Sequence, residues 1–333
     1  MSLKIAVVGT GTVAQRNYLP FLAQQADVSL SYYNRTREKA DTCAEKFGGW
    51  AADSIDHLLS DSPDAVLLLT NETVRYNFGL EILKHQPKRL FFEKPLVAQH
   101  DQAHVTEDDF EKGRDLLRKA RESGTQTAMV FNYRFFDQTL AARRIIAERN
   151  FGDLMQVTGF VHYACWSHSI DLIHLFAGPV TTITALSGEL ERQTSGFKLQ
   201  AQDVAAAFTT DGGATGTILG TTGTSFAFPL FELLFSFEGG RFTFRGLDGD
   251  MEVLDYRSNQ HELHSLTRGT SQWDQYNRSF EKATDAYLQS VRAGTEPPVP
   301  GMAGLQELQF EAGLKRSIRL GRPVNLREEF PLD

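Results

Sequence analysis

The sequence predicts an α/β domain with a parallel sheet, followed by an α+β domain with a largely antiparallel open sheet. The chain has 333 residues, enough for about two domains of roughly 150 residues. In its first half, short apolar segments alternate with helical patterns, which is typical of a parallel sheet covered on both faces. After about residue 150, strand-like segments follow one another directly, which indicates antiparallel pairing. We assign residues 1–125 to the first domain and 126–333 to the second, with the boundary in the region 120–135.

The first half is expected to contain five strands separated by helices. The strands are Leu3–Val8, Val28–Tyr33, Ala65–Leu69, Arg89–Phe92 and Thr127–Tyr133. The helices are Thr36–Phe47, Ile55–Leu59, Thr73–His85 and one that ends at Glu122. Thr106 and Asp109 have the spacing of a capping box, so the last of these helices is expected to begin there.

The second half is expected to be rich in strands. The strand-like segments are Leu154–Tyr163, Val180–Glu191, Val204–Thr210, Ala214–Thr222, Phe231–Phe237 and Arg241–Arg245. Gly212-Gly213 and Gly239-Gly240 lie between pairs of them and predict hairpin turns. One helix is expected at Ser167–Phe176, and two close the chain at Tyr276–Ala293 and Met302–Gly321, with the turn Pro297–Pro300 between them.

Composition excludes several classes of protein. The content of 41% hydrophobic and 23% charged residues is that of a globular protein. A net charge of -8 argues against a protein that mainly binds nucleic acid. No apolar run is long enough for a transmembrane helix and no signal peptide is visible, so no membrane partner is expected. Cys43 and Cys165 have no metal-site spacing and form no disulfide framework, which favours a reducing, cytoplasmic location and no metal site.

A glycine-rich turn follows the first strand. Gly9, Thr10, Gly11, Thr12 and Val13 precede a small residue in a GxGxxA pattern. The first glycine permits the tight turn, and the second lets the backbone approach a pyrophosphate at the start of the next helix. In this context of strand, turn and helix the pattern predicts a Rossmann dinucleotide-binding domain. The alternative is an ordinary strand–helix turn that uses glycine for packing alone.

The end of the second strand indicates which dinucleotide is bound. NAD-binding domains usually carry an acid there for the ribose hydroxyls. This chain has Asn34, Arg35 and Arg37 instead, with no acid before Glu38. A guanidinium pairs well with a 2′-phosphate, so we expect NADP(H) to be preferred and NAD(H) to be possible. The alternative is a solvated basic helix start. Further cofactor contacts are expected at Thr70 and Asn71 after the third strand, and at Glu93 and Lys94 after the fourth.

Several motifs together resemble the Gfo/Idh/MocA oxidoreductase family. They are the GxGxxA turn with Pro20 behind it, Glu93-Lys94-Pro95 after a strand, Asn132-Tyr133-Arg134, His168-Ser169-Ile170-Asp171, and the closing segment from Tyr287-Leu288 to Gly321-Arg322-Pro323-Val324. The triplet is the most specific of them. The resemblance covers nearly the whole chain.

This resemblance implies a Rossmann domain followed by an α/β domain whose open sheet forms a homodimer or a higher oligomer. It also implies hydride transfer between a nicotinamide cofactor and a sugar, cyclitol or related polyol. Lys94 matches the family's active-site lysine, and His168 its histidine. Beside a cationic nicotinamide the ammonium form of Lys94 is disfavoured, so Lys94 could deprotonate a hydroxyl and His168 could relay the proton. Glu93 would hold the lysine, and Pro95 would fix the turn, as a cis bond does in the family.

The chain departs from the family pattern near the substrate. Ala164 stands where the family often has an Asp, the loop before the HxxD helix is short, and Arg75 stands where a histidine is common. Tyr163 and Trp166 could line the pocket instead, or belong to the core.

Three polar residues are further candidates for substrate contacts. Asn132 and Arg134 end a strand and could bind a substrate, and an interdomain salt bridge is the alternative for Arg134. Asp171 shares a helix face with His168 and is interpreted as an orienting partner.

The motifs predict an NADP(H)-dependent oxidoreductase that acts on a sugar or polyol. Two alternatives remain. One is a non-catalytic protein that senses a dinucleotide or a sugar on the same fold. The other is a glycosidase or lyase that oxidises its substrate transiently with a retained nucleotide.

Overall fold

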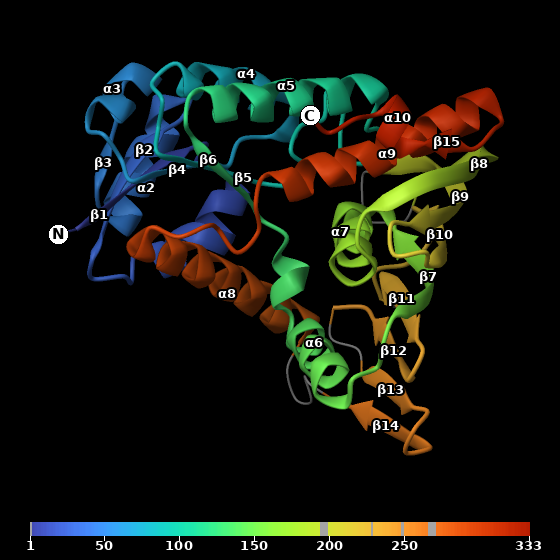
Figure 1. The fold of residues 1–333 in the computed structure, drawn as a ribbon. Coiled ribbons are helices and arrows are strands. Elements are labelled where there is room, and N and C mark those ends of the chain that lie inside the picture. The colour runs from blue at the N-terminus through green and yellow to red at the C-terminus, as the bar shows by residue number, and fades with distance from the viewer. Residues whose placement is uncertain (1, 194–198, 228, 248–249, 266–270) are drawn as a thin grey trace.

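The computed structural model describes residues 2–193, 199–227, 229–247, 250–265 and 271–333. The first of its two sheets is parallel, with six strands in the order β3-β2-β1-β4-β5-β6 (Figure 1). These strands are β1 (Leu3–Val8), β2 (Val28–Tyr33), β3 (Trp50–Ala51), β4 (Ala65–Leu68), β5 (Arg89–Phe92) and β6 (Gln126–Met129). Because β1, β4 and β5 are central and buried on both faces, they read as continuous apolar runs.

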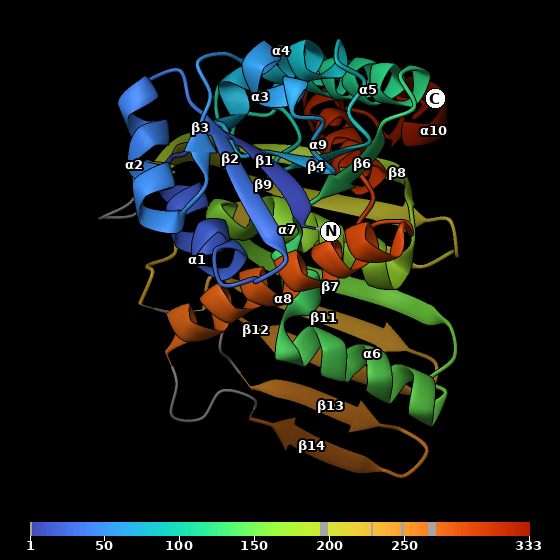
Figure 2. The same ribbon diagram turned by 90° about the vertical axis from the view of Figure 1, so that its left-hand side faces the viewer.

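Helices cover both faces of this sheet (Figures 1 and 2). One layer contains η1 (Ala14–Tyr18), α1 (Leu19–Leu22), α2 (Arg37–Phe47) and α8 (Gln272–Ala293); the other contains α3 (Ile55–Ser60), α4 (Glu72–Leu83) and α5 (Glu107–Glu122). Ile5 and Val7 pack on the first layer, whereas Ala6 and Val8 pack on the second. α8 therefore returns from the far end of the chain to complete the first domain. Among the described residues, no helix is both long enough and apolar enough to span a membrane.

The second sheet has nine strands in the order β14-β13-β12-β11-β7-β10-β9-β8-β15. Their bounds are β7 (Leu154–His162), β8 (Val180–Gln193), β9 (Gln200–Thr210), β10 (Thr215–Thr221), β11 (Phe231–Phe237), β12 (Gly240–Arg245), β13 (Met251–Asp255), β14 (Gln260–His264) and β15 (Val324–Asn325). All pairs are antiparallel except β10 with β7. The predicted fold class is confirmed.

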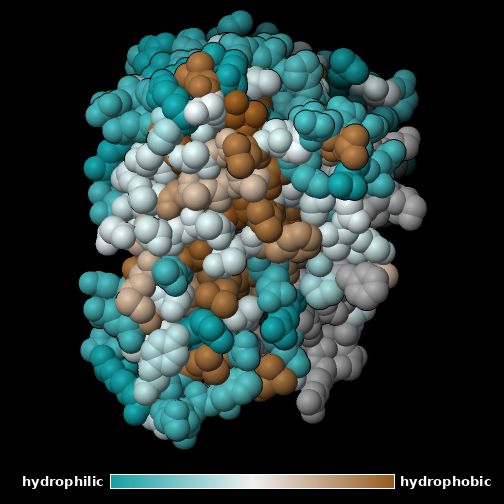
Figure 3. All heavy atoms as spheres, turned by 90° about the vertical axis from the view of Figure 1, so that its right-hand side faces the viewer, coloured by the Kyte–Doolittle hydropathy of each residue, from teal (hydrophilic) through white to brown (hydrophobic). Residues whose placement is uncertain are grey.

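Helices lie on one face of the second sheet, and the other face is open. α6 (Asp137–Arg149), α7 (Trp166–Ala177) and α9 (Met302–Leu320) lie on the covered side, with the short η2 (Asn132–Phe135), η3 (Tyr163–Cys165) and α10 (Leu326–Glu329) beside them (Figure 1). On the open side, Phe160, Leu219, Ala205 and Leu186 are successive cross-strand neighbours on β7, β10, β9 and β8. We call these four residues the sheet-face patch. Figure 3 shows hydrophobic side chains gathered along the middle of this face.

The structure differs from the sequence predictions around the domain junction. The strand predicted at Thr127–Tyr133 ends at Met129, and η2 follows it. The proline-rich turn runs beside β6, where Met129 N donates to Val299 O and Gly301 N donates to Thr127 O, both at 3.0 Å. This contact covers the outer edge of the first sheet. The domain boundary after residue 125 stays a prediction, and β6 directly after it completes the first sheet.

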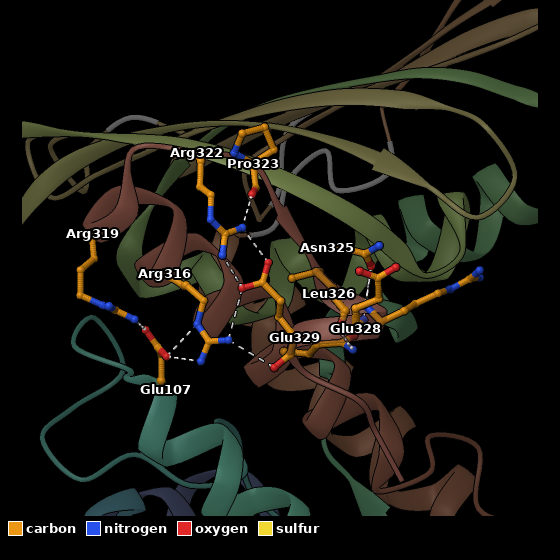
Figure 4. A network of polar contacts seen from close by, with 11 residues as sticks. Glu107, Arg316, Arg319, Arg322, Pro323, Asn325, Leu326, Glu328 and Glu329 are labelled. Atoms are coloured by element: carbon orange, nitrogen blue, oxygen red, sulfur yellow. Dashed lines mark hydrogen bonds and ion pairs between the residues drawn. The ribbon is translucent and has the colours of Figure 1, made fainter.

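A network of ion pairs connects α5 of the first half to α9 and α10 (Figure 4). Glu107 accepts from Arg316 Nε at 2.9 Å and from Arg319 Nη2 at 2.8 Å. Glu329 accepts from Arg322 Nη1 at 2.8 Å and lies 3.4 Å from Arg316 Nη1. Arg316 therefore pairs both with Glu107 of the first half and with Glu329 near the end of the chain. The capping box predicted at Thr106 and Asp109 is present, because these two residues exchange hydrogen bonds at the start of α5.

Candidate active site

A cleft of about 350 Å³ opens at the carboxyl ends of β1, β2 and β4. This is the edge of a parallel sheet at which ligands of such folds bind. Its lining includes four groups of residues from separate parts of the chain: the glycine turn, the end of β2, the start of α2, and the loop from β4 into α4. They are Val8, Gly9, Gly11, Tyr33, Asn34, Arg35, Thr36, Lys39, Leu69, Thr70, Asn71, Thr73, Val74 and Phe78.

The two glycines of the turn meet different surroundings. Gly9 has φ +95°, and a Cβ there would lie 2.7 Å from Thr70 N, so this position requires glycine. A Cβ on Gly11 would meet nothing within 4 Å, because Gly11 faces the open cleft. The geometry thus fits a pyrophosphate that approaches the backbone. Thr12 and Val13 are exposed on the same turn.

The side chain of Asn34 connects the end of β2 to the glycine turn through hydrogen bonds. Its Oδ1 accepts from Thr10 N at 3.2 Å, and its Nδ2 donates to Thr36 O at 3.1 Å. Thr10 itself is fully buried. Asn34 therefore closes the turn where an NAD-binding domain would usually place an acid.

The cations predicted to bind the cofactor are arranged differently from the sequence prediction. Arg35 lines the cleft, but Arg37 does not. Arg37 Nε pairs with Asp41 at 2.8 Å, and its Nη1 pairs with Asp53. Lys39, which was not selected from the sequence, lines the cleft in its place. The spacing of Arg37 and Asp41, four residues apart on α2, was the available signal that Arg37 has a partner on its own helix.

The turn after β5 is held by buried polar groups. Glu93 accepts from Tyr18 Oη at 2.7 Å and from Lys94 N at 2.8 Å. The Lys94–Pro95 bond is cis, as the resemblance implied. Arg75, which is 2% exposed, donates to the carbonyl groups of Glu93, Pro95 and Thr70. Because Thr70 lines the cleft, Arg75 links the cleft to the turn that carries Lys94.

Lys94 acts electrostatically on His168 across the domain junction. Lys94 Nζ donates to Gln102 Oε1 at 2.8 Å. His168 is 2% exposed and stacks on Tyr133, with ring centroids 4.1 Å apart. Burial lowers the pKa of His168 well below its ordinary value, and the charge on Lys94 lowers it further. Neither ring nitrogen of His168 has a hydrogen-bond partner among the described residues. The imidazole is therefore held in its neutral form, which leaves one ring nitrogen as a hydrogen-bond acceptor and the other as a donor.

The substrate-contact predictions for Tyr163 and Trp166 are not supported by their positions. Tyr163 is 4% exposed and donates to Gln202 O at 3.1 Å. Trp166 is 1% exposed and packs over Gly220 of β10. Both rings therefore belong to the core beneath the second sheet, because the short η3 turn directs them inward instead of into a cleft.

The polar candidates at the junction already have protein partners. Arg134 Nε and Nη2 donate to the two carboxylate oxygens of Asp171, at 2.8 and 2.6 Å. Asn132 is fully buried and donates to Ser279 Oγ of α8 at 2.8 Å. Arg134 thus forms a salt bridge with Asp171. Both residues lie within 126–333, so this is not the interdomain salt bridge of the alternative prediction. These contacts join η2 to α7 and α8.

Comparison with known protein families identifies both halves of the chain. Residues 3–130 match the family model of an oxidoreductase family with an NAD-binding Rossmann fold, Gfo/Idh/MocA. Residues 150–326 match the C-terminal alpha/beta domain of the same family. The chain belongs to the Gfo/Idh/MocA oxidoreductase family. The predicted family and the prediction of an oxidoreductase are confirmed.

Individual relatives are distant. Glucose-6-phosphate 3-dehydrogenase of Bacillus subtilis is 20% identical over 161 residues, which cover 48% of this chain and 42% of that protein. An oxidoreductase from Agrobacterium radiobacter in complex with NAD+, L-tartaric acid and magnesium has a TM-score of 0.80 at 15% identity, covering 98% of this chain and 99% of that one. The WlbA dehydrogenase from Bordetella pertussis, in complex with NADH and UDP-GlcNAcA, has a TM-score of 0.75 at 19% identity with the same coverage. These likenesses confirm the fold.

Proposed function

We propose that this protein is an NADP(H)-dependent oxidoreductase that transfers hydride to or from a secondary alcohol or ketone of a sugar, cyclitol or related polyol. The observation that carries the proposal is the pairing of a basic nucleotide cleft with Lys94 and a neutral His168 across the junction. The names of two relatives, a glucose-6-phosphate 3-dehydrogenase and a dehydrogenase in complex with UDP-GlcNAcA, support a sugar-like substrate. Free, buried Cys43 and Cys165 agree with a cytoplasmic enzyme.

Lys94 and His168 supply the proton chemistry in this proposal. When bound, the nicotinamide supplies the acceptor for the hydride that leaves the alcohol carbon. With Lys94 as the neutral amine, the hydroxyl O–H bond breaks and its proton forms an N–H bond on Lys94. Gln102, which now accepts from Lys94 Nζ, must give up this contact to the substrate oxygen. Neutral His168 is proposed to relay the proton onward and not to hold it, because burial and the charge on Lys94 lower its pKa.

A substrate panel tests the assigned reaction. Purified protein with NADP+ is offered hexoses, hexose phosphates, nucleotide sugars, sugar acids and cyclitols, and formation of NADPH is followed by its absorbance. The expected result is turnover with at least one class. Failure of every class in both directions, with nucleotide binding intact, would contradict a dehydrogenase.

Arg35 and Lys39 are proposed to bind the 2′-phosphate, in place of Arg37. Replacing both with Ala is expected to weaken NADPH binding by about tenfold to a hundredfold, since a hydrogen bond to a charged group contributes about 1.5–3 kcal/mol. NADH binding should hardly change. Calorimetric titration measures both. Arg37→Ala is the matched control, because Arg37 pairs with Asp41 and Asp53 outside the cleft; a larger loss in this variant than in the double variant would reverse the assignment.

A non-catalytic nucleotide sensor is the second candidate. It is favoured by Ala164 and by the core positions of Tyr163 and Trp166, which leave the substrate side with few of the predicted contacts. A sensor would bind the dinucleotide and show no turnover with any compound of the panel.

We also propose that the open sheet face is the contact between copies of this chain. In the sheet-face patch, Leu186 is 72% exposed, Leu219 47% and Phe160 44% (Figure 3). A contiguous exposed apolar row of this kind marks an interaction surface. Leu186→Asp with Leu219→Asp should convert an oligomer into monomers, as measured by light scattering with size-exclusion chromatography. Leu320→Asp, at an exposed leucine of α9, is the control and should not change the mass. A monomeric wild-type protein would contradict this interface.

A further inference from the structure

The segment between Pro95 and α5 reaches back to the lysine of the proposed site. Lys94 Nζ donates to Gln102 Oε1 at 2.8 Å, although eight positions separate the two residues along the chain. Among the described residues, this amide is the hydrogen-bond partner of the Nζ atom, and no carboxylate forms an ion pair with it. The group that holds the proposed base is therefore neutral.

Contacts on both sides of Gln102 fix the course of this segment. Before it, Gln99 N donates to Asp109 Oδ1 at 2.8 Å, which ties the backbone to the start of α5. After it, Ala103 and Val105 are 4% and 1% exposed and pack into the hydrophobic core. Gln102 thus lies between two anchored stretches of chain, and its side chain is half-buried.

A tight turn carries Gln102. His104 N donates to Asp101 O at 3.1 Å, which closes a turn with Gln102 and Ala103 at its centre. Asp101 Oδ1 also accepts from Ala103 N at 2.8 Å and lies 2.9 Å from His104 Nδ1. An Asp side chain that bonds to the backbone two residues later is a common way to stabilise a turn. The amide of Gln102 therefore reaches Lys94 from a backbone that is held independently of it.

The kind of acceptor determines what Lys94 is able to do. An amide oxygen accepts a hydrogen bond from an amine as well as from an ammonium group. A carboxylate at the same distance would form an ion pair and stabilise the ammonium form, which cannot take a proton from a substrate hydroxyl. Gln102 therefore holds the Nζ atom without favouring its charged form in this way.

The titratable groups around Lys94 make no hydrogen bond or ion pair with its Nζ atom among the described residues. The carboxylate of Glu93 accepts from the backbone N of Lys94 instead. Cys165, His168 and Glu307, which belong to η3, α7 and α9, experience the charge on Lys94 through space. None of these groups is altered when Gln102 is replaced, so such a substitution tests the contact with Gln102 by itself.

We propose that Gln102 is a positioning residue, which holds the Nζ atom of Lys94 with a neutral acceptor until the substrate oxygen replaces it. The inference rests on the proposed function. Because the contact places the Nζ atom before the substrate arrives, the substrate hydroxyl meets an amine whose position is already set. Gln102 itself neither gains nor loses a proton, and the hydroxyl proton passes to Lys94.

The pH dependence of kcat/KM for alcohol oxidation tests this role, since it reports on groups of the free enzyme. Gln102→Glu keeps the side-chain length and exchanges the amide for a carboxylate. The acid limb of the profile should therefore move to higher pH by about one to three units. Gln102→Met has nearly the same length but no oxygen, so kcat/KM should fall by about tenfold with little movement of the limb.

Gln99→Glu is the matched control for the added charge. It lies on the same segment, but its side chain bonds to Asp108 and not to Lys94. Its profile should coincide with that of the wild-type protein, and thermal unfolding verifies that each variant is folded. An acid limb that stays in place in Gln102→Glu, or an unchanged kcat/KM in Gln102→Met, would overturn the inference.

Reductive methylation supplies a readout that needs no turnover. Formaldehyde reacts with a free amine and not with an ammonium group, and mass spectrometry of the digested protein measures the methylated fraction of Lys94. The pH of half-maximal reactivity should be higher in Gln102→Glu than in the wild-type protein and unchanged in Gln99→Glu. Equal values in Gln102→Glu and the wild-type protein would overturn the inference. If the wild-type protein turns over no compound of the panel, the proposed function fails, and this reactivity alone decides whether Gln102 acts on Lys94.

Discussion

Replacing Lys94 with Met is expected to reduce turnover by about 10²- to 10⁴-fold, the range for removing a general base. Met has nearly the same length but cannot take the hydroxyl proton. NADPH affinity should stay close to that of the wild-type protein, because the Lys94 side chain is absent from the lining of the nucleotide cleft. The measurement is the rate of NADPH formation with the best compound of the substrate panel.

Lys88→Met is the matched control for this loss. Lys88 lies just before β5, at the end opposite to Lys94, and its ammonium group pairs at the surface with Asp64. Its removal should leave turnover unchanged. Equal turnover of Lys94→Met and the wild-type protein would remove Lys94 from the chemistry and favour the sensor.

Breaking the buried ion pair of Arg134 and Asp171 should have the largest effect on stability. Asp171 is 1% exposed, and Arg134 is 16% exposed. Removing one partner of a buried pair leaves an uncompensated charge and costs about 3–5 kcal/mol. Asp171→Leu and Arg134→Met are each expected to lower the free energy of unfolding by this amount, as measured by urea denaturation. The double variant should recover much of the loss, since it buries no charge.

The surface pair of Arg118 and Glu122 is the control for the buried pair. Its side chains are 52% and 59% exposed, and their ion pair spans 2.6 Å. Exposed pairs contribute about 0–1 kcal/mol, so Arg118→Met should change stability little. Similar decreases in the free energy of unfolding at the buried and the exposed pair would show that burial does not determine how much an ion pair contributes to stability.

The elements best predicted from the sequence are the central strands. β1, β2 and β5 have the predicted bounds. The apolar residues of β1 and β5 are consecutive because these strands are buried on both faces, whereas in β2 serines alternate with valine, leucine and tyrosine. The edge hairpin of β13 and β14 was not predicted, since β14 is mostly polar and no glycine pair marks the turn. α6 was also missed. Its N-cap, Phe136, makes no side-chain cap hydrogen bond, so the usual start signal is absent.

The residues of the candidate site could be predicted from the sequence, but the residues that they contact could not. The glycine turn and the Lys94 motif are local, so sequence order suffices to find them. The pairing of Arg134 with Asp171 joins residues far apart in the chain, and only tertiary packing reveals it. Lys39 carries no motif. Its role depends on which side of α2 meets the cleft.

Fluorescence titration of the purified protein with NADPH and with NADH tests the central claim most directly. The account predicts tight NADPH binding and clearly weaker NADH binding, because Arg35 and Lys39 line a cleft in which Asn34 stands in place of the usual acid. Equal binding, or a preference for NADH, would contradict the phosphate-binding role of the two cations. No binding of either nucleotide by protein free of retained cofactor would contradict the dinucleotide-dependent function itself.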